Sequence, residues 1–207
     1  FLVLLGVEGL FSLGEAGLVG GPEAVGWRTA YITQFGFSGA AFDWMLDNGV
    51  WPPEHLVRFL SYPFMHFDFY HALFAMVLLL AMGKVVGEAL GTFAFLSIFA
   101  VSAMTGALAF GLISDDPWLV GAYPSVYGLI GGFTYLLWLR LGQFGAPQCR
   151  AFTLIGMLVM IQLLFSVLFG GDMSWVADVA GFATGFPLAV LMVPGGWARF
   201  LAKLRGR

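Results

Sequence analysis

The chain reads LVGAYPSVYGLIGGF at residues 119–133, a hydrophobic run in which Pro124 and Ser125 stand among four glycines. Apolar residues extend the run to about residue 141, which gives the roughly 20 residues that a helix needs to cross the hydrocarbon core of a bilayer. The stretch therefore predicts a transmembrane helix. It also raises the question of whether Ser125 is a nucleophile inside the membrane.

The composition extends this prediction to the whole chain. Of the 207 residues, 60% are hydrophobic and only 10% are charged, and the mean hydropathy of +0.90 lies far above that of soluble domains. Five further apolar runs have the length of a membrane span, at roughly 1–20, 69–90, 92–113, 151–170 and 174–194. We therefore expect an all-α integral membrane protein in which residues 1–207 form one domain, a bundle of six transmembrane helices.

The sequence argues against several kinds of ligand. The net charge is −3 and no basic stripe is interleaved with aromatic residues, so nucleic acid is not an expected partner. Cys149 is the only cysteine, which excludes a disulfide or a Cys-based metal cluster within one chain. His66 and His71 lie five residues apart, whereas a helical zinc pair lies four apart and needs a third ligand. We expect no metal, no other cofactor and no small-molecule substrate.

The positions of the Lys and Arg residues predict the orientation. With six spans both termini lie on the same side, and that side carries seven of the nine cations, which leaves Arg28 and Arg58 opposite. We therefore expect both termini in the cytoplasm and, for so compact a chain, a bacterial inner membrane. The last segment, GGWARFLAKLRGR (195–207), is expected to lie as a short amphipathic stretch on the cytoplasmic surface of the bilayer.

The first connection, residues 21–68, is much longer than the others and rich in aromatic residues. Aromatic rings favour the headgroup level of a bilayer, so this composition suits structure that is partly embedded in the membrane. We expect short helices in the outer leaflet and a hydrogen-bonded Arg58 within the loop. The side chains expected at the interface are Trp27, Phe42, Trp44 and Trp51.

Ionisable and small residues inside the apolar runs point to packing. Glu8 and Glu15 lie seven residues apart, hence on one face of the first span, where a proton or cation pathway is one interpretation and packing towards the loop or a partner is the preferred one. Small residues spaced four apart let helix backbones approach closely. The third, fourth and sixth spans are therefore expected at the centre of the bundle, with close contacts at Gly128, Gly132, Gly181 and Gly185.

Three segments together resemble the rhomboid intramembrane proteases and their inactive relatives. FMHFDFYHALFAM (64–76) is similar to the second-helix pattern His-x-x-x-x-His-x-x-x-Asn. VGAYPSVYGLIGGF (120–133) aligns without gaps with the fourth-helix pattern Gly-x-Ser-Gly-x-x-Tyr-Gly, which carries the nucleophile. ADVAGFATG (177–185) is similar to the sixth-helix pattern Ala-His-x-x-Gly-x-x-x-Gly, which carries the base. The resemblance covers essentially the whole chain and implies a six-helix rhomboid-like bundle with a partly embedded first loop.

The resemblance fails at the residues that would do the chemistry. The nucleophilic serine of the pattern falls on Tyr123 and the glycine after it on Pro124, while the catalytic histidine falls on Asp178 and the oxyanion-stabilising asparagine on Ala75. A phenol is a poor acyl-transfer nucleophile, and a carboxylate does not serve readily as both base and acid near neutral pH. Proline also lacks the N–H that would help to stabilise an oxyanion. The positions that match the patterns are His66, His71, Tyr127, Gly128, Gly181 and Gly185.

Ser125 is expected to be a spacer beside this dismantled site. Two residues along a helix correspond to about 200° around it, so Ser125 faces away from the side that Tyr123 presents. A serine in a span commonly bonds to a carbonyl of its own helix. A rescued nucleophile would need Pro124 to kink the helix, with Asp178 or His71 as its base. We expect instead that Tyr123 and Asp178 form a hydrogen bond that acts as a structural clasp.

The expected function is that of a rhomboid-like protein without a catalytic residue. It would bind transmembrane segments or membrane-protein partners within the lipid bilayer, because inactive relatives of rhomboids act in membrane-protein quality control, trafficking or assembly. Two alternatives stay open. One is a fixed accessory subunit of a larger membrane complex, and the other is a residual intramembrane serine protease that uses Ser125.

Overall fold

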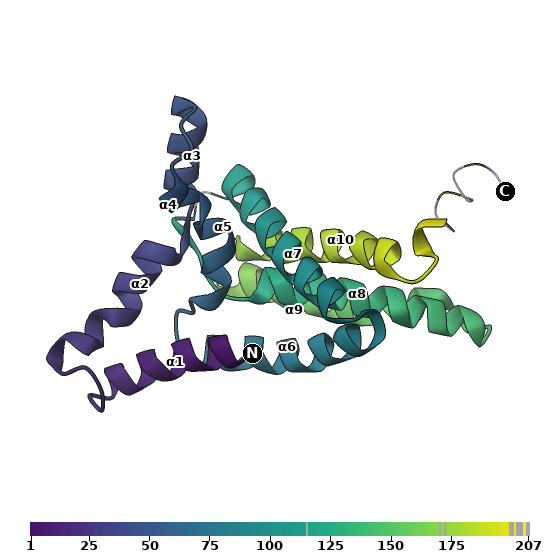
Figure 1. Ribbon diagram of the computed structural model, residues 1–207, viewed down its shortest axis with the longest axis horizontal. Coiled ribbons are helices and arrows are strands. Elements are labelled where there is room, and N and C mark those ends of the chain that lie inside the picture. Colours follow the sequence, from purple (N-terminus) through teal and green to yellow (C-terminus); the bar gives the residue numbers. More distant parts are fainter. Residues whose placement is uncertain (115, 170, 172, 199–200, 202–204, 206–207) are drawn as a thin grey trace.

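The computed structural model describes residues 1–114, 116–169, 171, 173–198, 201 and 205. Its long helices are α1 (Leu2–Glu15), α6 (Phe69–Leu90), α7 (Thr92–Ile113), α8 (Tyr123–Gln143), α9 (Thr153–Phe169) and α10 (Ser174–Met192). Helices α6 to α10 form a bundle, and α1 lies with the helical first loop at one end of it, on the left in Figure 1. Helices α6, α8 and α10 begin at that end and run away from it. The expected all-α helical bundle is confirmed.

Four stretches of the described chain are long and apolar enough to cross a membrane: Phe69–Leu90, Thr92–Ile113, Gln148–Phe165 and Ser174–Met192. Two of the six expected spans fall outside this set. Helix α1 has only 14 residues, about 21 Å at 1.5 Å per residue, and is therefore shorter than the hydrocarbon core. Helix α8 has 21 residues and is long enough, but it is less apolar than these four stretches. Its first half is mostly buried, so the neighbouring helices separate that half from lipid.

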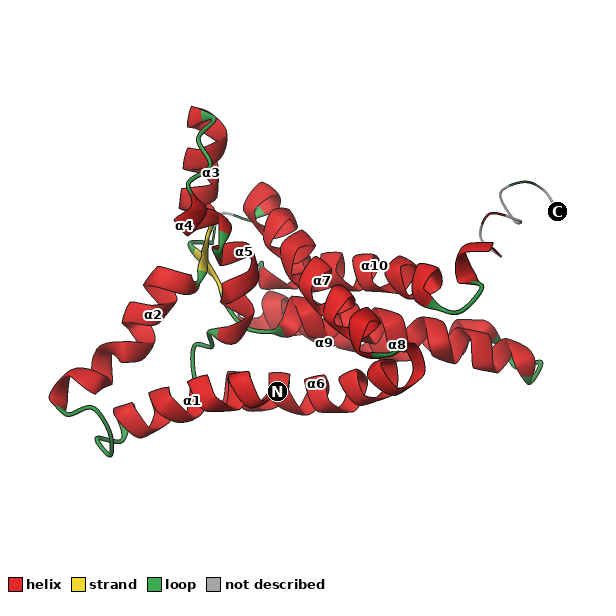
Figure 2. Ribbon diagram, viewed as in Figure 1, coloured by secondary structure: helices red, strands yellow, loops and turns green. Residues whose placement is uncertain are grey.

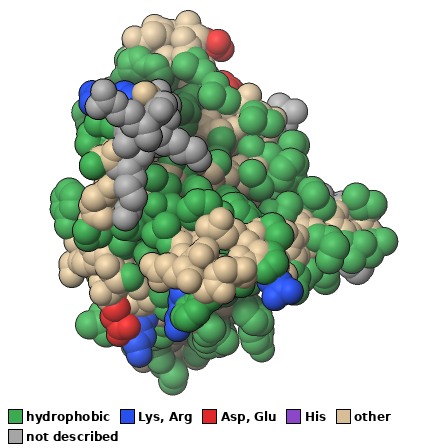
Figure 3. All heavy atoms as spheres, turned by 90° about the vertical axis from the view of Figure 1, so that its right-hand side faces the viewer, with side chains coloured by type: hydrophobic (Ala, Val, Ile, Leu, Met, Phe, Trp, Pro, Cys, Tyr) green, Lys and Arg blue, Asp and Glu red, His purple; other side chains and the backbone are tan. Residues whose placement is uncertain are grey.

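The outside of the bundle is apolar, as lipid contact requires. Large side chains such as Phe74 on α6, Phe93 on α7 and Val167 on α9 are mostly exposed. Figure 3 shows one end of the molecule, where hydrophobic side chains cover most of the described surface and charged side chains are sparse. The arrangement is that of a membrane protein, because a soluble domain rarely exposes such continuous apolar patches.

The first loop folds into short helices rather than an extended chain. Along the sequence these are η1 (Pro22–Gly26), α2 (Trp27–Phe35), α3 (Gly39–Asn48), α4 (Pro53–Leu56), α5 (Arg58–Ser61) and η2 (Tyr62–Phe64). Local signals explain the bounds of α3: the Ser38 hydroxyl caps its start by accepting a hydrogen bond from the Ala41 N–H at 3.2 Å, and Gly49 ends it at a positive φ of 64°. That these helices lie in the outer leaflet stays a prediction.

Two of the expected interface residues, Trp44 and Trp51, are about half exposed. The expectation for Phe42 is wrong, because its side chain is only 1% exposed. The Phe42 ring lies 5.9 Å from the Phe37 ring and fills the space that the missing side chain of Gly111 leaves on α7. A ring in that position fixes α3 to the bundle instead of anchoring it in lipid.

A short strand pair joins the loop to the bundle. Strand β1 (Phe37–Ser38) pairs antiparallel with β2 (Trp118–Leu119), drawn in yellow in Figure 2, with Phe37 opposite Leu119. Nearby, the Tyr62 hydroxyl donates a 2.9 Å hydrogen bond to the Ala103 carbonyl of α7. Burial raises the pKa of Tyr62 well above its usual value, so this phenol stays a neutral donor.

The predicted fourth span starts later than the apolar run suggests. Residues 118–119 are in β2, and Gly121 then turns the chain at a φ of 101° before α8 begins at Tyr123. A side chain at Gly121 would come within 2.8 Å of the His71 ring. Pro124 lies in the first turn of α8, where its missing N–H costs no helical hydrogen bond, so it starts the helix without kinking it.

Helices α7, α8 and α10 meet through their small residues. A side chain at Gly181 of α10 would collide with the Pro124 carbonyl of α8, and one at Gly185 would collide with the Gly128 carbonyl. The Ser102 hydroxyl of α7 donates to the Gly181 carbonyl at 3.1 Å. Gly132 is less crowded, since its nearest neighbours would be the methyl groups of Val86 and Ile98. Helices α8 and α10 are therefore in backbone contact, and the Ser102 side chain joins α7 to them.

The amphipathic segment expected at 195–207 lies largely outside the described residues. Three of its four cations, Arg199, Lys203 and Arg207, are among the residues that are not described. Its placement on the cytoplasmic surface stays a prediction.

Candidate functional site

A cavity of about 400 Å³ opens at the end of the bundle where α6, α8 and α10 begin. Its walls come from four helices and from β2, so residues far apart in the sequence meet there. The lining residues are Phe67, Asp68, His71, Trp118, Leu119, Val120, Tyr123, Pro124, Gln162, Ser174 and Asp178. Four of the residues predicted for the site, His71, Tyr123, Pro124 and Asp178, are thus brought together.

Tyr123 packs against the first turn of α6. Its ring lies parallel to the His71 ring, with the centroids 5.0 Å apart and the planes inclined by 11°. The phenol hydroxyl donates to the His71 carbonyl over 3.4 Å. The position that carries the nucleophile in the fourth-helix pattern is therefore filled by a stacked aromatic ring.

Asp178 stands on the second turn of α10 and is 3% exposed. Its Oδ2 atom accepts a 2.6 Å hydrogen bond from the side-chain amide of Gln162 on α9. The clasp predicted between Tyr123 and Asp178 is thus corrected: both side chains line the cavity, but the hydrogen bonds described for them go to the His71 carbonyl and to Gln162. Helix α9 supplies an amide donor to the carboxylate, while the phenol is directed to the first turn of α6.

Ser125 does not face the cavity. It is fully buried, and its hydroxyl donates a 2.9 Å hydrogen bond to the Phe99 carbonyl of α7. The predicted orientation away from Tyr123 agrees with this contact, whereas the expected partner on its own helix was wrong. Ala75 and Tyr127 also lie in the buried core of the bundle.

His66 supports the site from behind. Its Nε2 atom accepts a long 3.4 Å hydrogen bond from the Ala122 N–H, and its ring meets the His71 ring edge-on with centroids 5.3 Å apart. Burial, followed by the charges of His71 and Arg28, lowers the pKa of His66 to about 3, so this imidazole is neutral at physiological pH. Within the described residues no three His, Cys, Asp or Glu side chains gather as metal ligands would.

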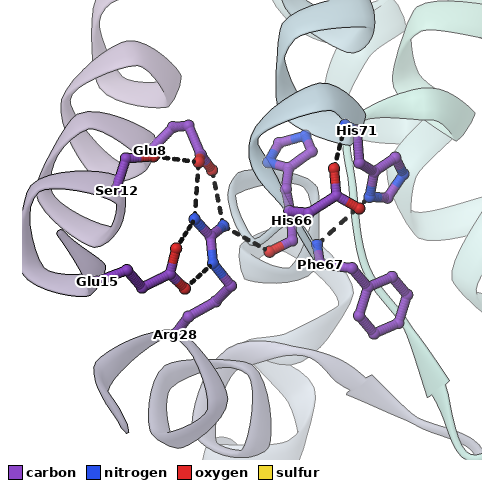
Figure 4. Close-up of polar contacts among 8 residues, drawn as sticks. Glu8, Ser12, Glu15, Arg28, His66, Phe67 and His71 are labelled. Atoms are coloured by element: carbon purple, nitrogen blue, oxygen red, sulfur yellow. Dashed lines mark hydrogen bonds and ion pairs between the residues drawn. The ribbon is translucent and has the colours of Figure 1, made fainter. Parts of the chain in front are cut away.

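An ion cluster behind His66 joins α1 to the first loop and is buried at Glu8 and Arg28 but partly exposed at Glu15. The preferred prediction that Glu8 and Glu15 pack towards the loop is confirmed, but their partner was not predicted. Figure 4 shows the Arg28 guanidinium between Glu8, Glu15 and the His66 carbonyl. The donor–acceptor distances from Arg28 are 2.8 and 2.9 Å to Glu8, 2.6 and 3.1 Å to Glu15, and 3.1 Å to His66. Hydrogen bonding to Glu8 is the main cause that raises the pKa of Arg28. The sequence could have indicated a cation partner, since two acidic residues on one face of a helix at membrane depth are unfavourable unless they are paired.

Arg58 lies near Trp118 of β2. Its Nη1 atom reaches the Gly36 carbonyl at 3.5 Å, and its guanidinium carbon lies 5.9 Å from the centre of the Trp118 ring. The predicted hydrogen bond within the loop is present but long. Burial lowers the pKa of Arg58, which fits a cation held mainly by an aromatic face.

Comparison with known proteins identifies the family. The Rhomboid domain matches residues 53–195, well over half of the chain. The chain belongs to the rhomboid family. The match includes helices α6 to α10 and thus every wall of the cavity. The predicted rhomboid bundle is therefore confirmed at the level of the family.

Curated rhomboids give the same result. The rhomboid protease GlpG of Klebsiella pneumoniae is 32% identical over 132 residues, which are 64% of this chain and 47% of that protein. The rhomboid protease GlpG of Salmonella choleraesuis is 30% identical over 148 residues, 72% of this chain and 50% of that protein. The chain spans about half the length of the curated relatives it matches.

Proposed function

We propose that this rhomboid binds transmembrane segments of other membrane proteins without cleaving them. The observation that carries the proposal is the Tyr123 ring stacked on His71 at the position of the family's nucleophile. Intramembrane proteolysis needs a nucleophile beside a base and donors for the developing oxyanion. Each of these three requirements meets an obstacle in this chain.

The nucleophile is the first obstacle. The Tyr123 hydroxyl is directed to a backbone carbonyl, and the nearest serine, Ser125, donates to the Phe99 carbonyl of α7 in the buried core. Catalysis by Ser125 would require α8 to rotate by about half a turn, because the residue lies roughly 200° from Tyr123 around the helix. Backbone contact between Gly181 and Pro124 opposes such a rotation.

The base and the oxyanion donors are the other obstacles. Asp178 accepts from the Gln162 amide, and a carboxylate exchanges protons near neutral pH less readily than an imidazole. Pro124 supplies no N–H to an oxyanion, and Ala75 supplies no side-chain donor. The cavity itself remains, with a volume in the range of ligand sites. Binding without cleavage is the activity that these residues support.

The expected result of a cleavage assay is that neither this protein nor the Tyr123→Ser, Asp178→His double variant cuts a transmembrane substrate. The variant restores the dyad residues but leaves Pro124 and Ala75 in place. Purified protein is reconstituted in liposomes with a fluorescent rhomboid substrate, and GlpG of Klebsiella pneumoniae serves as the active control. A fluorophosphonate probe reports on Ser125. Cleavage by the unaltered protein, or stoichiometric labelling of Ser125, would overturn the proposal in favour of a residual protease.

The binding half of the proposal is tested by cross-linking. A photoreactive residue at Phe67, in the cavity wall, should capture many membrane proteins in small amounts, whereas one at Phe93, on the exposed face of α7, should not. Mass spectrometry of the adducts then locates the captured peptides within transmembrane segments. One stoichiometric partner captured at both positions would point to a fixed accessory subunit instead.

The proposed location is a bacterial inner membrane with both termini in the cytoplasm. Cys149 is exposed in the connection between α8 and α9, so it should react with a membrane-impermeant maleimide only after spheroplasts are opened. The matched control is Cys149→Ser with Val25→Cys in the exposed first loop, which should react in intact spheroplasts. Reversed labelling of the two variants would refute the orientation.

A further inference from the structure

The cavity has the chemistry of a cation site. Asp178 presents a buried carboxylate to it, and Asp68 supplies a second one at its rim. Asp68 is partly occupied, because its Oδ1 atom caps α6 by accepting a 2.9 Å hydrogen bond from the His71 N–H. Asp178 is the buried carboxylate of the wall, whereas Asp68 is exposed to solvent. The partner of Asp178 on α9, the Gln162 amide, is neutral.

The side-chain oxygen of Gln162 gives independent support for a ligand with hydrogen-bond donors. While its amide nitrogen donates to Asp178, its side-chain oxygen is buried and has no hydrogen-bond partner within the part of the chain that the structure describes. A buried acceptor without a donor costs about 1–3 kcal/mol. A ligand that brings N–H groups into the cavity would satisfy this oxygen and contact the carboxylate beside it.

The other walls fit a cation as well. Phe67, Trp118 and Tyr123 place aromatic rings around the cavity, and ring faces attract ammonium and guanidinium groups. Trp118 already lies near one cation, Arg58, which does not line the cavity. Among the described lining residues none is Lys or Arg, and His71 is the one basic side chain.

We propose that the cavity receives a Lys or Arg side chain from the bound transmembrane segment and pairs it with Asp178. This rests on the proposed function and adds the chemistry of the ligand. Such a residue is unfavourable at membrane depth unless it is paired, so a segment that carries one gains from a buried carboxylate with aromatic walls. Arg fits best, since its planar fork can bond a carboxylate and an amide oxygen together and stack on rings.

The test uses the full chain in dodecyl maltoside and three synthetic transmembrane peptides that differ at one position near one end, Arg, Gln or Glu. The Arg peptide should bind at least about tenfold more tightly than the Gln peptide, as expected for a pair desolvated in a cavity, and the Glu peptide should bind least. Asp178→Asn keeps the shape of the side chain and should lower the affinity for the Arg peptide to that for the Gln peptide. Asp43→Asn, on the exposed face of α3, is the control and should change nothing.

The outcomes separate this inference from the function on which it rests. Equal binding of the Arg and Gln peptides by the unaltered protein would overturn the cation site but leave segment binding intact. Binding of none of the peptides would overturn both. Phosphatidylcholine or phosphatidylethanolamine could instead raise the melting temperature of the unaltered protein but not that of Asp178→Asn, while the Arg and Gln peptides bind equally. In that case the cation comes from a lipid headgroup and the proposed partner is wrong. The Gln peptide also serves as a folding control, because a misfolded Asp178→Asn variant would bind neither the Arg peptide nor the Gln peptide.

Discussion

Arg28→Met is expected to lower the free energy of unfolding by about 3–5 kcal/mol, the usual cost of leaving a buried charge without its partner. Arg28 is 6% exposed and Glu8 is 3% exposed, so water replaces little of the lost interaction. The guanidinium also holds the His66 carbonyl at 3.1 Å, just before α6 begins. Loss of Arg28 should therefore loosen the first loop from both α1 and the site.

Two further variants make this prediction specific. Adding Glu8→Gln to Arg28→Met removes the buried one of the two carboxylates that lose their partner, and should restore a large part of the lost stability. Arg58→Met should cost much less, because Arg58 makes one long hydrogen bond, 3.5 Å to the Gly36 carbonyl. Unfolding is followed in detergent by near-UV circular dichroism against denaturant. If Arg28→Met lowers the free energy of unfolding by less than about 1 kcal/mol, then water screens the charges of the cluster as it screens exposed ion pairs.

The helices were predictable because the membrane sets their length and composition. The apolar runs at 69–90 and 92–113 contain α6 and α7, and the order of three short patterns indicated the rhomboid family. The start of α8 was not predictable from hydrophobicity alone. Trp118 and Leu119 are as apolar as a span, but they pair with Ser38 and Phe37 of the first loop, which lie 80 and 82 residues away in the sequence.

The site was predictable as a set of positions but not as a set of partners. Alignment with the family patterns placed Tyr123 and Asp178 together, and both line the cavity. The partner of Asp178 depends on which face of α9 meets α10. Helix α9 is apolar nearly all round, so no stripe of hydrophobic residues fixes that face in the sequence. The sequence shows Gln162 as a polar residue within an apolar run, but it does not indicate that Asp178 is the residue to which Gln162 donates.

Gly181→Ala is expected to lower the free energy of unfolding by about 3 kcal/mol, the upper part of the range for an overpacked core. A Cβ atom at Gly181 would collide with the Pro124 carbonyl of α8, and a backbone atom cannot move aside as a flexible side chain can. Helices α8 and α10 must then separate. The Ser102 bond to the Gly181 carbonyl would be strained by the same shift.

Gly156→Ala on α9 is the matched control, because no atom lies within 4 Å of its added Cβ. Both substitutions remove a glycine from a helix and gain about 1 kcal/mol of helix propensity, so their difference isolates the collision. Thermal unfolding in detergent should show Gly181→Ala melting below the unaltered protein and Gly156→Ala at or above it. Because Pro124 and Asp178 stand on the two helices forced apart, the Arg peptide should also bind less tightly to Gly181→Ala. Equal stability of the two variants would show that α8 and α10 are not in backbone contact at Gly181, and the cavity would then lack the rigid floor on which its geometry depends.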